Sequence, residues 1–270
     1  MTKFSEDIFQ ILAYLDNEKA KITNKTSEKV KSFKVYNNEK ALSEATHLKM
    51  FMQLLDDLLM NDTSISFYDG ETISRATKRM KIITENELEY GRRSDLIVKN
   101  KEAEEQYDLS SNEFKKTGMS HDILTRQQSK NLRINACIIN DINLLLGNAN
   151  SRINYFDFSG RQSYISQLFS FDGCFVAYKV GSFTIPKNLM QLNQFRFSLI
   201  ALYRWKKCTI DNSKKVLFEI LKAEDDYGLV EVSNDIVNYR LSPPRDNVNH
   251  VQVVFSPSKG SKRTISVLQN

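Results

Sequence analysis

Two short runs of strand-forming residues carry the feature that most limits how this chain can fold. Asp95 opens the apolar run Leu-Ile-Val, and the acid-x-lysine triplet Glu113, Phe114 and Lys115 ends a second run, beyond an acidic connector. Side chains two residues apart in a strand point to the same face of a sheet. We therefore expect Glu113 and Lys115 to share one face and Phe114 to occupy the other. A hairpin between strands predicted at 94–99 and 106–115 would bring Asp95 to the same patch.

Two carboxylates beside an ammonium group predict a metal site with a cation for a phosphate. Hard carboxylate oxygens suit Mg²⁺, which keeps part of its water shell for a substrate, and Mn²⁺ is an acceptable substitute. A strand carbonyl near Phe114 could complete the ligand set. The alternative is a pair of exposed strands joined by a surface salt bridge, because an Asp followed at variable distance by Glu-x-Lys also arises by chance.

The stretch resembles the PD-(D/E)XK superfamily, the restriction-endonuclease-like nucleases. The first acid of that motif falls on Asp95, the second on Glu113 and the lysine on Lys115, while Ser94 stands where the usual proline would be. The runs GRRSDL, LSSNEFK and QQSKNLRIN are also similar to a group of fungal proteins of this type. The resemblance implies an α/β restriction-endonuclease-like core, with a mixed central sheet flanked by helices. It also implies Mg²⁺-dependent hydrolysis of phosphodiester bonds in DNA, with Asp95 and Glu113 as metal ligands and Lys115 as the catalytic cation.

The same resemblance implies two auxiliary residues. An extra acid is expected near the motif, and Glu44 on a predicted helix competes for this role with Glu71, which follows Gly70. A polar residue that contacts the metal-bound water is expected on the helix after the motif, as Gln127 or Gln128. The sequence leaves both choices open.

Basic residues are concentrated directly after the motif. Residues 116–215 hold 14 Lys/Arg against 5 Asp and no Glu, a net charge of +9, whereas residues 1–115 hold 18 bases and 21 acids, a net charge of −3. A cluster of basic side chains attracts a polyanion, so we expect nucleic acid as the partner. The resemblance implies that this nucleic acid is DNA. The alternative is scattered charge that only confers solubility. The expected contacts are Arg75, Arg92, Arg93, Arg126, Lys130 and Arg133.

Cysteine usage and the apolar pattern predict a reducing compartment. The three cysteines are isolated from one another, no CxxC pair occurs, and the three histidines lie far apart, so a zinc site is not expected. The N-terminus lacks the basic start of a signal peptide, and no apolar run is long enough to span a membrane. We therefore expect an intracellular protein, nuclear or cytoplasmic, with no membrane partner.

We expect three regions: an N-terminal helix and arm at 1–37, a domain at 38–223 that the resemblance implies to be nuclease-like, and a weakly structured tail at 224–270. Within the domain, an amphipathic helix is expected at 39–60 with Asn38 as its cap, and a strand at 64–68 ends at an Asp-Gly turn. The remaining elements are a helix at 122–147 closed by Gly147, strands at 163–171 and 174–185, and helices at 188–206 and 211–223. The nearly continuous apolar run VAYKV predicts a buried strand.

A second class of function stays open at this stage. The same fold could hold nucleic acid or another protein without cutting it, as a binding module. The intact set of Asp95, Glu113 and Lys115 favours the enzyme, and a metal-dependent cleavage assay separates the two.

Overall fold

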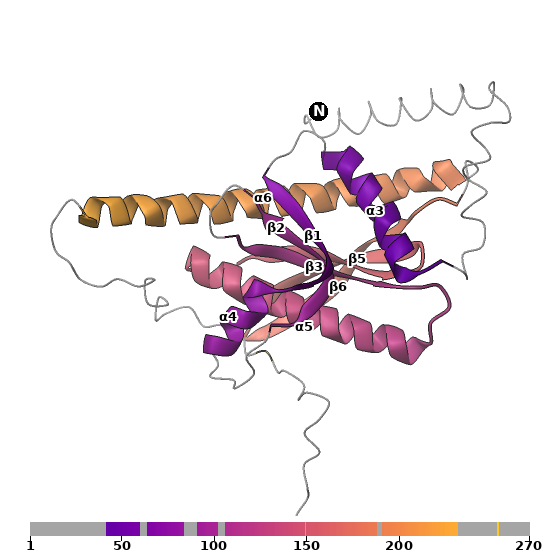
Figure 1. The fold of residues 1–270 in the computed structure, drawn as a ribbon, viewed down its shortest axis with the longest axis horizontal. Helices are drawn as coiled ribbons and strands as arrows, with labels where there is room; N and C mark the ends of the chain where they lie inside the picture. The colour runs from indigo at the N-terminus through magenta and orange to yellow at the C-terminus, as the bar shows by residue number, and fades with distance from the viewer. Residues whose placement is uncertain are drawn as a thin grey trace, which may run out of the picture.

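A computed structural model describes residues 42–59, 64–83, 91–101, 106–148, 150–187, 191–231 and 253, with the backbone alone at 192 and 223–231. The protein is an α/β fold in which a six-stranded sheet lies between helices (Figure 1). The predicted class, a mixed sheet flanked by helices, is confirmed at this level. The predicted N-terminal helix and arm at 1–37, including the expected helix at 4–20, lie outside the described residues.

The sheet runs in chain order from β1 to β6 and contains one parallel pair. Neighbouring strands are antiparallel except β3 and β4, which are parallel because a long helix, α5 (His121–Leu146), carries the chain back between them. The sheet is therefore mixed, and its centre is the β3–β4 pair. The strands are β1 (Ile65–Ile73), β2 (Arg93–Asn100), β3 (Asp108–Lys115), β4 (Arg152–Ser159), β5 (Gln162–Phe171) and β6 (Cys174–Thr184).

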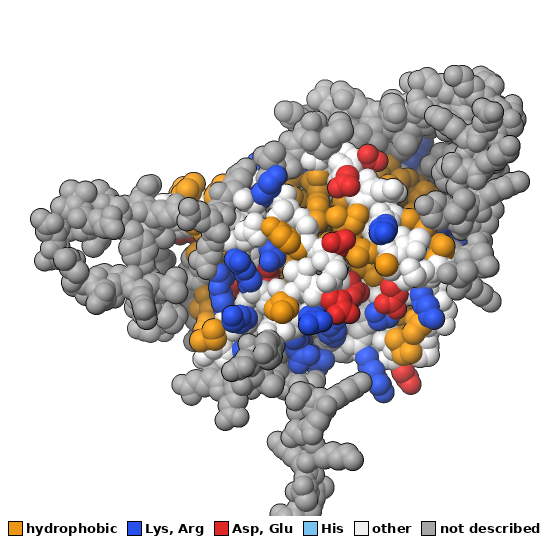
Figure 2. Space-filling model, in the orientation of Figure 1, with side chains coloured by type: hydrophobic (Ala, Val, Ile, Leu, Met, Phe, Trp, Pro, Cys, Tyr) orange, Lys and Arg blue, Asp and Glu red, His pale blue; other side chains and the backbone are white. Residues whose placement is uncertain are grey.

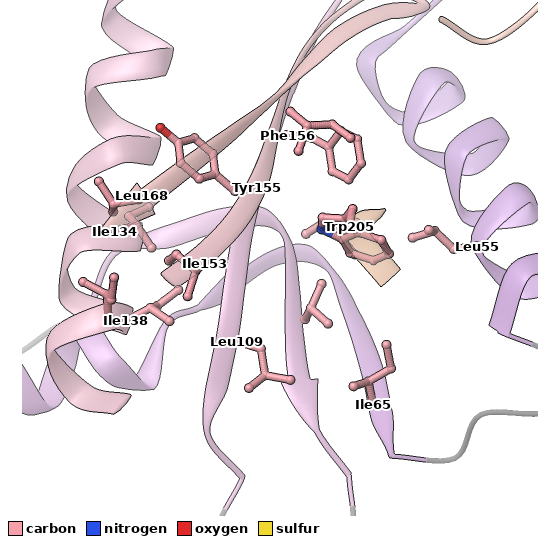
Figure 3. Close-up of a cluster of buried hydrophobic side chains, with 14 of the residues drawn as sticks. Leu55, Ile65, Leu109, Ile134, Ile138, Ile153, Tyr155, Phe156, Leu168 and Trp205 are labelled. Carbon is pink, nitrogen blue, oxygen red and sulfur yellow. The ribbon is translucent and has the colours of Figure 1, made fainter. Parts of the chain in front are cut away.

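One face of the sheet is covered by α5. Its residues Ile134 and Ile138 are fully buried and lie beside Ile153 and Tyr155 of β4 (Figure 3). The helix ends at Gly147, which adopts the left-handed conformation with φ 63°, a conformation that costs glycine little because it has no Cβ. The predicted helix at 122–147 and its glycine end are confirmed.

A shorter helix, α4 (Arg75–Ile83), packs beside α5. Its first turn is capped by the fully buried Asp108, whose Oδ2 accepts hydrogen bonds from Ser74 Oγ at 2.9 Å and from the Ala76 N–H at 3.1 Å. An ion pair of 2.8 Å between Arg79 and Asp141 joins the two helices. Across the described ranges, no helix combines the length and the apolar character needed to cross a membrane.

The other face of the sheet is covered by α3 (Glu44–Leu59) and α6 (Leu192–Glu231). Phe51 of α3 is fully buried, and the aromatic side chains on this face surround it. Its ring centroid lies 4.7 Å from that of Phe158 and 5.0 Å from that of Phe156. Trp205 of α6 packs on Phe156 at 5.4 Å, and Figure 3 shows these two residues with Leu55 on the side away from α5. The core is therefore aromatic on this face and aliphatic on the other.

The helix boundaries differ from those expected. The first helix begins at Glu44 rather than at 39, and Ser43 caps it by accepting the Thr46 N–H at 3.1 Å; the expected cap, Asn38, lies outside the described residues. The two helices predicted at 188–206 and 211–223 form one continuous helix. The segment between them has neither glycine nor proline to break it, and the Thr209 hydroxyl is satisfied within the helix by the Trp205 carbonyl at 3.0 Å. α6 also passes the predicted domain boundary at 223.

The strands differ in three places. β4 was not predicted, although its run RINYFDFS is rich in aromatic and β-branched residues. Asp69 and Gly70 do not end β1; the pairing with β2 shifts there, and Gly70 and Glu71 have φ of 77° and 59°, as in a β-bulge. The VAYKV run is exposed rather than buried, because β6 is an edge strand of the sheet.

We predict that Phe51→Ala lowers the free energy of unfolding by about 3–5 kcal/mol, because it removes a fully buried ring from a packed aromatic cluster. The matched control is Phe197→Ala on α6, where the side chain is 76% exposed and the expected loss is below about 0.5 kcal/mol. Urea denaturation of both variants measures the difference. Equal effects would show that Phe51 is not central to the core.

Candidate active site

The pairing of β2 with β3 brings the two motif acids together. Leu96 pairs with Asn112 and Ile97 with Ser111 in antiparallel register, so Asp95 stands opposite Glu113. Opposed residues in an antiparallel pair point to the same face, and here that face is the one covered by α5. The hairpin expected from the sequence therefore forms, with Asp95 half-buried and Glu113 1% exposed.

Asp95 is held in place by the backbone of the next strand. Its Oδ2 accepts a hydrogen bond of 2.7 Å from the Phe114 N–H. This bond fixes the carboxylate against the end of β3, beside Glu113. Because the bond occupies one lone pair, the other carboxylate oxygen keeps its capacity to accept a donor or a cation.

Glu113 is a buried carboxylate on whose pKa the neighbouring charges act in opposite directions. Burial and, second, the neighbouring charge of Asp95 raise its pKa to about 7, against the opposing effect of Lys130 and Lys115. The Lys130 ammonium of α5 lies 2.7 Å from Glu113 Oε1 in an ion pair. Glu113 thus stands between one acid and two bases.

Lys115 ends β3 and contacts two groups. Its Nζ donates to Glu44 Oε2 at 3.0 Å and to the Phe114 carbonyl oxygen at 2.8 Å. Its charge also lowers the pKa of Glu113, which places the ammonium near that motif acid. The ion pair with Glu44 is partly exposed, so its main consequence is to orient Lys115 rather than to stabilise the fold.

The two candidate auxiliary acids lie in different surroundings. Glu44, in the first turn of α3, contacts Lys115. Glu71 lies in the β1 bulge opposite Asp95, but its carboxylate is 68% exposed and pairs with Arg93 at 3.1 Å. Of the two, Glu44 is the acid that contacts a member of the motif.

The two candidate glutamines project from α5 toward β4 and β5. Gln127 is buried, and its Nε2 donates to the Phe158 carbonyl at 3.4 Å, while its Oε1 has no partner among the described residues. Gln128 donates to the hydroxyl of Tyr164. The two side chains therefore lie over β4 and β5, and neither has a hydrogen bond to Asp95 or Glu113 in the described part of the chain.

The basic residues expected to contact nucleic acid are divided among several roles. Lys130 and Arg93 are paired with acids, as described above. Burial and, second, the nearby charge of Arg133 lower the pKa of Arg92. Arg75, at the start of α4, and Arg126, on α5, are exposed. Figure 2 shows acidic side chains near the middle of the displayed face and Lys and Arg side chains along its lower part.

A third buried acid adjoins the motif and was missed. Asp157 of β4 pairs in parallel register with Glu113, so it lies one strand away on the same face. Burial raises its pKa to about 6, and the hydrogen bond of 2.9 Å from Asn131 Nδ2 acts against that rise. A strand assignment for RINYFDFS would have identified it, since Asp157 alternates with two core phenylalanines.

The candidate ligand atoms at the site are all oxygens, the ligand type that a hard divalent cation prefers. Asp95, Glu113 and the Phe114 carbonyl are oxygen ligands of the type that Mg²⁺ takes. Burial and the charge of Asp95 raise the pKa of Glu113, an effect that a bound cation would oppose. Among the described residues, no three His, Cys, Asp or Glu side chains are arranged to hold a metal ion together. The protein ligands would thus be two carboxylates and a carbonyl.

Comparison with known proteins adds no relative. No protein-family model, no curated protein and no solved structure matches the chain.

We predict that Glu113 makes the fold less stable as the pH rises through its titration range. Its pKa is 4.5 ordinarily and about 7 in the folded protein, so between these values the folded state binds the proton more tightly than the unfolded state does. The stability of the wild type then falls across this window, relative to Glu113→Gln, by on the order of 3 kcal/mol. Urea denaturation of both proteins from pH 4.5 to 8 measures it. A difference that does not change with pH would contradict the assignment.

Proposed function

We propose that this protein is a Mg²⁺-dependent nuclease that hydrolyses phosphodiester bonds in DNA. The observation that carries the proposal is the convergence of Asp95, Glu113 and Lys115 at the ends of two adjacent strands, beside α5. An acid on one strand facing an acid-x-lysine on the next is the arrangement that the PD-(D/E)XK resemblance implies.

The order of the elements supports the same proposal. The chain runs α3–β1–β2–β3–α5–β4, with α4 inserted between the first two strands. This is the helix, three strands, helix, strand order of a restriction-endonuclease-like core. The two motif strands lie in the middle of that series, and β4 returns parallel to β3.

The residues have separate roles in such a reaction. When bound, Mg²⁺ would lower the pKa of a water ligand and neutralise charge on the phosphate. Asp95 and Glu113 would hold the metal, with Asp95 aimed by the Phe114 N–H. Lys115, oriented by Glu44, would stabilise the negative charge that develops on the phosphate oxygens or align the attacking water.

Exposed arginines on α4 and α5 would supply contacts for the nucleic-acid backbone. Arg126, on the first half of α5, and Arg75, at the start of α4, are exposed. Such side chains bind phosphate without reading sequence. The net charge of +9 over residues 116–215 favours a polyanionic substrate over a neutral one.

One observation favours a second candidate, a module on the same fold that binds nucleic acid or protein without cutting. Two of the acids at the site already have internal cations, Lys130 on Glu113 and Lys115 on Glu44. A site neutralised in this way could persist as a structural network.

We predict metal-dependent cleavage that needs Lys115. Incubation of the pure protein with plasmid and single-stranded DNA should give cleavage with Mg²⁺ or Mn²⁺ and none with EDTA. Lys115→Ala should reduce the rate by about 100-fold or more, because the lost ammonium acts on charge that develops in the transition state. Lys116→Ala, at the exposed neighbouring position, should keep wild-type activity. A wild type inactive with both metals would favour the binding module.

We predict that the divalent cation binds at the two motif acids. Above its dissociation constant, each tenfold increase in Mg²⁺ or Ca²⁺ should add about 1.4 kcal/mol to the free energy of unfolding. Asp95→Asn and Glu113→Gln should abolish this increase, which thermal unfolding at several cation concentrations measures. Asp172→Asn, in the exposed β5–β6 turn, is the matched control and should respond like the wild type. Stabilisation that survives both site substitutions would place the cation elsewhere.

A further inference from the structure

A polar cavity of about 360 Å³ adjoins the candidate active site. It lies between the first half of α5 and strands β4, β5 and β6. Its wall includes the two α5 glutamines, the buried acid of β4 and a half-exposed aromatic ring, followed by residues of the edge strand: Gln127, Gln128, Asp157, Tyr164, Lys179 and Ser182.

The cavity begins one strand away from Glu113. Asp157 in its wall pairs with Glu113 in parallel register, and neighbouring strands lie about 4.8 Å apart. Both acids face α5, where Lys130 contacts Glu113 and Asn131 contacts Asp157. A substrate whose phosphate lies at Glu113 would therefore have an adjoining group at the mouth of this cavity.

The charges of the cavity select against a second phosphate. Lys179 is a cation and Asp157 an acid, so the formal charges of the wall cancel. The Asp157 carboxyl group is buried and accepts a hydrogen bond of 2.9 Å from Asn131 Nδ2, and a buried carboxylate disfavours an anionic ligand beside it. The occupant expected from this balance is uncharged and polar.

The remaining groups match the edge and the face of a nucleobase. Gln127 Oε1 is a buried acceptor without a partner among the described residues, and an unpaired acceptor in a wall is costly unless a ligand or water donates to it. The Tyr164 ring offers an aromatic surface, held by the hydrogen bond of Gln128 to its hydroxyl. Donors, acceptors and a ring are what proteins use to hold an unstacked base.

We propose that this cavity receives one unpaired nucleobase adjacent to the cleaved phosphodiester. The assignment of the adjacent phosphate rests on the proposed nuclease function. A base inside a duplex cannot enter a cavity without leaving its stack. The substrate is therefore single-stranded DNA, or DNA that is locally unpaired at the cleavage point.

The test is binding without metal, so that it does not depend on cleavage. Fluorescence anisotropy in EDTA compares a 12-nucleotide single strand, its blunt duplex, and a series of single strands with one abasic site moved along the sequence. We expect the single strand to bind about 10-fold more tightly than the duplex at equal salt, and one abasic position to weaken binding about 10-fold, as the loss of one base–aromatic contact does.

Three tyrosine variants test whether the cavity causes the preference for single strands and the sensitivity to one abasic position. Tyr164→Leu removes the ring and should weaken binding of the intact strand to the level that the wild type shows with the strand whose abasic site weakens binding most. That abasic strand should bind the Tyr164→Leu protein no more weakly than the intact strand does. Tyr164→Phe keeps the ring and should retain most of the affinity. Tyr178→Leu, an exposed tyrosine of β6 outside the cavity, is the matched control and should keep the wild-type profile.

The outcomes separate this inference from the proposed function. Cleavage with a flat abasic profile, or with equal affinity for duplex and single strand, overturns the base cavity and leaves the nuclease intact. An abasic profile that depends on position, without cleavage in any metal, supports the base-binding cavity and contradicts the proposed nuclease function. Absence of binding to every oligonucleotide overturns the base cavity, as does a Tyr164→Leu protein that retains the wild-type profile.

Discussion

The burial of Phe114 is the constraint on which the candidate site depends. Its ring stacks on Phe158 with centroids 4.4 Å apart and planes inclined by 7°, on the face covered by α3 and α6. Its backbone is equally engaged, because the N–H donates to Asp95 at 2.7 Å and the carbonyl accepts from Lys115 at 2.8 Å. Core packing of one side chain thus sets the direction of Glu113 before it and of Lys115 after it. A substitution at Phe114 would disturb the core and the site together.

A set of asparagines holds α5 over the site, where backbone pairing alone would not suffice. The parallel pairing of β3 with β4 covers only Glu113 to Lys115. Before that point, Asn112 bridges the two strands by accepting the Phe156 N–H at 2.9 Å. Asn135 of α5 clamps both backbone groups of Ser111, at 2.8 and 3.0 Å. These contacts fix the rotation of α5, and therefore which of its residues reach the acids: Lys130 and Asn131 rather than the exposed Arg126.

The sequence predicted the parts of this arrangement that depend on local spacing. The register of Asp95 with Glu113 followed from strand periodicity, and the end of α5 followed from Gly147. What could not be predicted depends on tertiary context. Whether VAYKV is buried depends on its place at the sheet edge, and whether Glu44 or Glu71 contacts the motif depends on how α3 crosses the strands. Asp157 was missed for a third reason: its strand is buried on both faces, and so the run lacks the regular apolar–polar alternation that marks a half-buried strand.

The charge balance of the site bears on the proposed binding of a polyanion. A buried carboxylate such as Glu113 needs a nearby cation, and Lys130 provides it from a helix rather than from the core. Lys130 and Lys115 have side chains 36% and 23% exposed, so each ammonium group already borders water. Either can exchange a carboxylate partner for a phosphate oxygen without crossing apolar surface. Both ion pairs therefore border water, whereas a cation fully enclosed in the core could not change partners without a large desolvation cost.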